Sequence, residues 1–160
     1  MSVQTKRVLL RFLFFALIGL LVEIFFTSLG RLQHGDINMK GHTSPWMMFD
    51  YGLLGIVTGP LMRSLKGVRV PLVGRAFVYM IGIFLVELVS GWVFDMCGIH
   101  VWDYSHLPLN VHGYITLTYA PLWYLLGLFV EFLYRRVDTT ALVFSLRLTA
   151  ERIEEMQGRS

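Results

Sequence analysis

Four apolar stretches constrain the fold of this chain more than any other feature of its sequence. They run from about Val8 to Leu29, from Trp46 to Met62, from Leu72 to Met96 and from Gly113 to Tyr134. A helix of about 20 apolar residues spans a hydrocarbon core of about 30 Å and bonds its own backbone groups, which lipid cannot do. We therefore expect an all-α integral membrane protein with a bundle of four transmembrane helices. The composition agrees, because 55% of the residues are hydrophobic and only 16% are charged.

The second stretch departs most from a typical span, because it is short and holds three glycines and a proline. Gly55 and Gly59 lie about one helical turn apart, a spacing that lets a neighbouring backbone approach closely. After Asp138, apolar and charged residues recur near helical spacing, which predicts a C-terminal amphipathic helix or, alternatively, a solvated tail. The expected organisation is a transmembrane domain of residues 1–137 and a cytoplasmic tail of residues 138–160.

Basic residues flank the stretches unevenly, and this predicts the orientation of the chain. Lys and Arg are in excess on the cytoplasmic side of membrane proteins. Of the fourteen basic residues, only Arg31 and Lys40 lie on one face. The others lie on the opposite face: Lys6, Arg7, Arg11, Arg63, Lys66, Arg69, Arg75, Arg135, Arg136, Arg147, Arg152 and Arg159. The asymmetry places both termini in the cytoplasm and explains the net charge of +3 without a nucleic-acid partner.

Five acidic residues interrupt the apolar stretches: Glu23, Asp50, Glu87, Asp95 and Glu131. A charge near the centre of a bilayer costs about 3 kcal/mol on insertion scales, so such residues normally face a bundle interior, a partner or water. Glu131 lies one turn before Arg135, which predicts a local ion pair or snorkelling at the inner interface. Asp50 and Asp95 lie near the outer ends of their spans, where we expect hydration to explain them.

Glu23 and Glu87 are the leading candidates for a site. Either each carboxyl group is neutral and bonded to another helix, or the two line a polar cavity that binds a cation, a proton or the polar head of a lipid. Gly19 and Thr27 lie one turn either side of Glu23, and Gly91 lies one turn after Glu87. These small neighbours would let the two glutamates meet.

All five histidines lie in the outer connections: His34, His42, His100, His106 and His112. Histidine with carboxylate can form a metal site or a pH switch, but these spacings match no compact ligand motif, so no metal ligand is assigned. The single cysteine, Cys97, excludes an internal disulfide.

The third connection, residues 101–113, is the densest in polar and aromatic side chains. Trp102 and Tyr104 suit the interfacial belt, and Asp103 can bond backbone amides in a turn. The loop is either a structural cap that satisfies its own backbone, or a lid over a site to which Trp102, Asp103 and Asn110 contribute.

Residues spread from Gly19 to Glu131 resemble those of one family of small bacterial membrane proteins. It is named the "putative ABC-transporter permease" family and includes the animal transmembrane protein 229 proteins. The shared residues keep the family's order and spacings: Gly19, Glu23, Phe26, Thr27, Thr43, Ser44, Trp46, Tyr51, Gly52, Glu87, Gly91, Trp102, Asp103, Tyr104, Ser105, Asn110, Gly113, Tyr119, Ala120, Pro121, Trp123, Gly127 and Glu131. Many bacterial relatives have an arginine after the loop glycine, where this chain has Tyr114.

The resemblance implies a role in transport. The chain has no Walker motif, so an ATPase would be a separate partner. We expect a small non-enzymatic protein that binds or helps to transport a lipid, small solute or cation through an outward-facing polar site. The candidate ligand-binding residues are Glu23, Glu87, Trp102, Asp103, Tyr104, Asn110 and Trp123.

Two alternatives stay open. One is an intramembrane metal-dependent enzyme that modifies lipids, with carboxylates and outer histidines as ligands. The other is a structural subunit of a larger membrane complex or homo-oligomer, whose acids pair with basic residues of a partner. Membrane lipids are expected partners in each case, and no cofactor is assigned.

Overall fold

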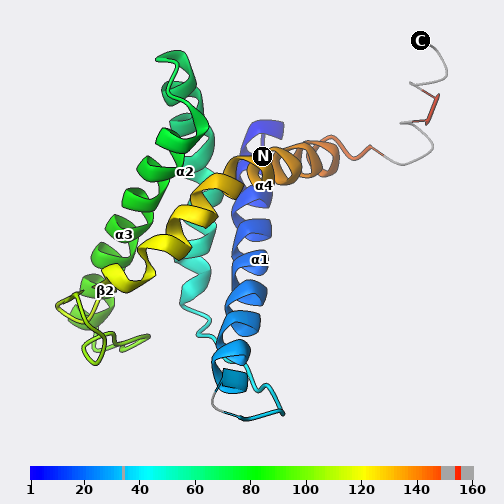
Figure 1. The fold of residues 1–160 in the computed structure, drawn as a ribbon. Coiled ribbons are helices and arrows are strands. Elements are labelled where there is room, and N and C mark those ends of the chain that lie inside the picture. Colours follow the sequence, from blue (N-terminus) through cyan, green and yellow to red (C-terminus); the bar gives the residue numbers. More distant parts are fainter. Residues whose placement is uncertain (34, 149–153, 156–160) are drawn as a thin grey trace.

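The computed structural model of the protein describes residues 1–33, 35–148 and 154–155 (Figure 1). Four long helices account for most of these residues: α1 (Val3–Gln33), α2 (Met47–Gly67), α3 (Leu72–Met96) and α4 (Ala120–Ser145). The mainly helical prediction is therefore confirmed.

A short hairpin joins α3 to α4. Its strands β1 (Asn110–Val111) and β2 (Ile115–Thr116) pair antiparallel and are followed by the 3-10 helix η1 (Leu117–Tyr119). The predicted helix start at Gly113 is therefore wrong. Gly113 has a φ of +75°, which glycine adopts without strain, and this turns the backbone into an extended strand before α4 begins.

Three helical segments in the described part of the chain are long and apolar enough to cross a membrane. They are Val3–Leu32, Leu72–Met96 and Leu117–Ser145. The protein is therefore an integral membrane protein. α2 is not among them, because its glycines, Pro60 and Asp50 dilute its apolar residues. Its crossing of the membrane stays a prediction.

Successive long helices run in opposite directions (Figure 1). α1 packs along α2, α3 packs against α4, and α4 also crosses α1 obliquely. The N-terminus and the end of α4 consequently lie at one end of the molecule, which we call the terminal end. The hairpin and the connection between α1 and α2 lie at the other, which we call the hairpin end (Figure 1).

The buried core lies where α1, α3 and α4 meet. It contains Phe15, Tyr79, Val130, Tyr134 and Val137. Many other large apolar side chains point outward and are more than half exposed, including Leu17, Phe25, Leu85 and Phe129. An outer surface this apolar suits lipid as its solvent.

Ion pairs tie α4 to its neighbours at the terminal end. Asp138 of α4 accepts hydrogen bonds from the guanidinium groups of Arg7 and Arg11 on α1. Arg11 also donates to the hydroxyl of Tyr134. Because one carboxylate receives two guanidinium groups, α1 and α4 are held by charge as well as by packing.

Glu131 makes a second such connection, to α3 and α2. It accepts from Arg75 Nε at 2.5 Å and from the Tyr79 hydroxyl at 2.9 Å, and Lys66 Nζ lies 3.1 Å away. The predicted local pair with Arg135 is wrong, because Glu131 is on the buried face of α4 whereas Arg135 is exposed. The guanidinium of Arg75 also offers two parallel hydrogen bonds to the carboxylate.

α1, α2 and α4 end later along the chain than predicted, whereas α3 runs from Leu72 to Met96 as predicted. α4 continues through residues 138–145, where Ala141 and Ser145 are buried, so the start of the predicted tail belongs to this helix. Glu154 and Glu155 are helical. The rest of the predicted amphipathic helix, residues 149–153 and 156–160, lies outside the described residues.

The close approach predicted for Gly55 and Gly59 is confirmed, and it occurs within the chain. A methyl group at Gly55 would strike the backbone carbonyl of Arg11 on α1, and one at Gly59 would strike the Tyr134 hydroxyl on α4. These two glycines let α2 approach two other helices closely.

We expect Gly55→Ala to lower the free energy of unfolding. Overpacking costs about 1–3 kcal/mol, and here the obstacle is backbone, which cannot rotate away. Gly82→Ala on α3 is the matched control, because nothing lies within 4 Å of the added methyl group. Unfolding in mixed micelles measures both variants. Equal stability of the two variants would contradict the close packing of α1 on α2.

Candidate functional site

Glu23 is bonded across three segments near the hairpin end. Its Oε2 accepts hydrogen bonds from the Thr43 hydroxyl at 2.5 Å and from the Tyr51 hydroxyl at 3.0 Å. Glu23 belongs to α1, Thr43 to the connection that follows it, and Tyr51 to α2. A methyl group at Gly19 would strike the Tyr51 ring, so this glycine makes room for the tyrosine beside Glu23.

Asp50 and Glu87 are both buried, at 6% and 8% exposure. Asp50 of α2 accepts from the Ser90 hydroxyl on α3 at 3.0 Å, and Glu87 of α3 accepts from the indole N–H of Trp123 on α4 at 3.1 Å. The hydration expected for Asp50 is therefore wrong. Asp50 lies near the end of α2, but the helix turns it toward α3 rather than toward solvent.

Hydrogen bonds connect the surroundings of Glu23, Asp50 and Glu87, and we call these three residues the acid cluster. Tyr51, which bonds Glu23, directly follows Asp50, and Ser90, which bonds Asp50, lies about one turn after Glu87. Three helices supply one carboxyl group each. The hydrogen-bond donors described above are neutral hydroxyl and indole groups. Within residues 1–33, 35–148 and 154–155, no salt bridge includes a member of the cluster.

The carboxyl groups at the two ends of the molecule therefore have different kinds of hydrogen-bond partner. Glu131 and Asp138 are paired with arginine or lysine, whereas the acid cluster has neutral donors. A buried carboxylate without a cationic partner is costly. Chemically, the cluster can lower this cost by taking up protons or a cation.

Aromatic rings from two segments adjoin the acid cluster. Tyr104 of the third connection packs edge-on against Tyr119 at 5.4 Å between ring centroids, and Tyr119 lies 6.2 Å from Trp123. The Tyr104 hydroxyl is near enough to Glu23 and Glu87 to interact with them, and burial raises the pKa of this tyrosine. Of the candidate loop residues, Tyr104 is the one that reaches the acid cluster.

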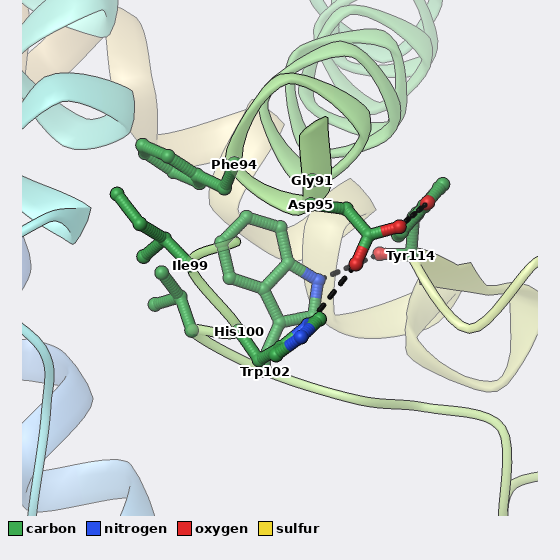
Figure 2. A pocket seen from close by; sticks show the side chains of 8 residues that line it. Gly91, Phe94, Asp95, Ile99, His100, Trp102 and Tyr114 are labelled. Atoms are coloured by element: carbon green, nitrogen blue, oxygen red, sulfur yellow. Dashed lines mark hydrogen bonds and ion pairs between the residues drawn. The ribbon is translucent and has the colours of Figure 1, made fainter. Parts of the chain in front are cut away.

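The polar side chains of the other candidate loop residues bond within the third connection. Asp103 accepts from the backbone N–H and the hydroxyl of Ser105, both at 2.8 Å. Asn110 donates to the Leu107 carbonyl at 2.7 Å. The indole N–H of Trp102 donates to the Tyr114 carbonyl at 2.8 Å, as Figure 2 shows. These bonds hold the loop in shape, as the structural reading of it predicts.

In the described part of the chain, no group of side chains supports the hypothesis of a metal-dependent enzyme. No three His, Cys, Asp or Glu side chains there are placed to hold a metal ion. His100 lies instead 3.0 Å from Asp95, and both are exposed. His34 falls outside the described residues.

Sequence reasoning did not assign Thr43, Ser90 or Asp50 to the site. Only the family resemblance drew attention to Thr43 and Tyr51, as two of the residues shared with the family. Ser90 carried no signal of its own, because a serine in an apolar helix commonly bonds its own backbone, as Ser90 also does to the Val86 carbonyl.

We expect the turn at Asp103 to loosen in acid. The Ser105 amide, which donates to its carboxylate, is the main cause of the lowered pKa of Asp103. A lowered pKa in the folded state stabilises the turn at higher pH, and this contribution is lost as pH falls through the lowered value. The protection factor of the Ser105 amide, which is the intrinsic exchange rate divided by the observed rate, should therefore fall in acid.

Two variants separate the charge from the hydrogen bond. Asp103→Ala should expose the Ser105 amide at every pH, whereas Asp103→Asn keeps an acceptor and should lose only the pH dependence. Asp36→Ala, in the other connection at this end, is the control. Unchanged exchange at Ser105 in Asp103→Ala would show that Asp103 does not hold this turn.

The chain was compared with models of known protein families. The model of a family described as "Putative ABC-transporter type IV" matches residues 10–153, which include all four long helices in whole or large part. No solved structure gives a significant match to the chain. Because the match covers most of the sequence, the chain belongs to this family of transport-related membrane proteins.

Proposed function

We propose that the protein acts in membrane transport, and that the acid cluster binds positive charge in the form of protons or a protonated organic solute. One observation carries the proposal. Glu23, Asp50 and Glu87 come from three helices and are met by neutral donors, although the same fold pairs the buried Glu131 with arginine and lysine. The family description supports a role in transport.

An organic cation suits the site better than a bare metal ion. The carboxyl groups interact through space but are not grouped tightly enough to ligate one ion in the described structure. Tyr104, Tyr119 and Trp123 lie beside them, and aromatic faces attract organic cations. We therefore favour a solute with an ammonium group.

The orientation follows from the uneven basic residues. We propose that all four helices cross the membrane, that both termini are cytoplasmic, and that the acid cluster opens toward the outer side. α2 can cross although it is less apolar, because Gly55 and Gly59 bury its backbone against α1 and α4. An ATPase, if the transport uses one, would be a separate chain.

Binding of methylammonium and tetramethylammonium tests the site. Purified protein in nanodiscs should gain thermal stability with either ion, measured against sodium at equal ionic strength. Glu87→Gln and Glu23→Gln should each weaken binding at least about tenfold, which corresponds to about 1.4 kcal/mol.

Asp36→Asn is the control for these variants, because Asp36 is a partly exposed carboxylate at the same end of the molecule. It should bind both ions as the unaltered protein does. If Glu87→Gln and Glu23→Gln bound both ions as tightly as the unaltered protein does, the proposed function would be wrong.

Cysteine labelling tests the orientation. Cys97 is exposed just after α3, and it is the single cysteine of the chain. A maleimide that cannot cross membranes should label it in intact cells. In a Cys97→Ser background, Ser2→Cys should react only after the membrane is opened. Labelling of both positions from the same side would contradict the three crossings proposed between Ser2 and Cys97, and with them the proposed orientation.

A further inference from the structure

Two adjoining hollows at the hairpin end share the side chain of Tyr114. One is small and polar, with room for about one water molecule in about 20 Å³, and it lies beside Asp95, His100 and Trp102 (Figure 2). The other is a groove of about 430 Å³ along α3, within the usual size range of ligand sites. We call the pair the Tyr114 site.

The polar hollow presents a carboxylate to solvent. Asp95 accepts from the Tyr114 hydroxyl at 2.9 Å and lies 3.0 Å from Nδ1 of His100 (Figure 2). The Asp95 side chain is 46% exposed and the His100 side chain 77%. Unlike the acid cluster, this carboxylate is open to a ligand without any movement of the helices.

The groove is apolar along most of its length. Leu88, Val89 and Trp92 of α3 line one side, and His112 and Tyr114 of the hairpin line the other. Val89 and Trp92 are both more than half exposed. Because α3 is apolar and long enough to cross a membrane, this exposed face of the helix is suited to contact lipid chains.

The groove and the polar hollow meet at the end of α3, where a helix of this length would leave the hydrocarbon core. α3 ends at Met96, one residue beyond Asp95. Trp92, Trp102 and Tyr114 surround this end, and such amphipathic rings gather at the membrane interface. An acyl chain in the groove would therefore bring a headgroup to Asp95.

We propose that the Tyr114 site binds a phospholipid with a primary-amine headgroup, of the phosphatidylethanolamine type. The acyl chain would lie against Val89 and Trp92, the ammonium would donate hydrogen bonds to Asp95, and the phosphate would lie near His100 and His112. A choline headgroup has no N–H to donate, and a glycerol headgroup brings no positive charge to the carboxylate. The site is separate from the acid cluster, since Asp95 lies about two helical turns beyond Glu87.

Native mass spectrometry of the full chain tests this proposal. Protein released from nanodiscs of equal parts phosphatidylethanolamine, phosphatidylcholine and phosphatidylglycerol should retain the ethanolamine lipid preferentially. Asp95→Asn should reduce that preference about tenfold while the protein still retains lipid. Val89→Trp, which fills the groove, should reduce retention of all three lipids.

Two controls match these variants. Val93→Trp places the same ring on an exposed valine one turn further along α3 that does not line the groove. Asp36→Asn removes a partly exposed carboxylate elsewhere at this end. Both should behave as the unaltered protein does. Equal retention of the three lipids, a preference for phosphatidylglycerol, or an unchanged preference in Asp95→Asn would overturn the proposal.

Soluble phosphoethanolamine separates the headgroup from the chain. It should compete only weakly with the lipid, since it cannot occupy the groove, and competition as strong as that of the lipid would overturn the role of Val89. Ammonium binding by the acid cluster should stay unchanged in Asp95→Asn, so the two proposals fail independently.

Discussion

The arginine–carboxylate pairs of α4 hold the arrangement of the helices together. An apolar exterior gives helices in lipid little reason to associate, because lipid chains solvate leucine and phenylalanine as well as another helix does. Asp138 and Glu131 supply directional contacts instead, one to α1 and the other to α3 and α2. The core around Phe15, Tyr79 and Val130 packs within the frame that these pairs define.

Within this frame, the carboxyl groups at the two ends have different partners. At the terminal end, carboxyl groups are matched by guanidinium groups, and the contacts are structural. At the hairpin end, the acid cluster has neutral donors, and Asp95 is open to solvent. Within the described residues the acid cluster has no arginine or lysine partner, so protons, solutes or lipid headgroups would supply the positive charge that basic side chains supply at the terminal end. Both proposals, the ammonium solute and the ethanolamine lipid, follow from this same imbalance.

The sequence predicts the helices well, because the length of an apolar stretch can be read from the sequence alone. Three of the helices have stretches long and apolar enough to cross a membrane. It also predicts the turn at Asp103, since that bond joins residues two positions apart. Partners across helices were harder to predict. The nearest basic residue to Glu131 along the chain is Arg135, yet its partners come from α3 and α2. The prediction that Asp50 is hydrated was wrong for the same reason, because its position near a helix end does not show which way its side chain points.

The spacing of Arg7 and Arg11 on α1 bears on how the helices can move. The two side chains are one helical turn apart, and both reach Asp138. A displacement of α1 along α4 by one turn, about 5.4 Å, would therefore leave one arginine on the carboxylate throughout. The two arginines would thus keep Asp138 compensated in either register.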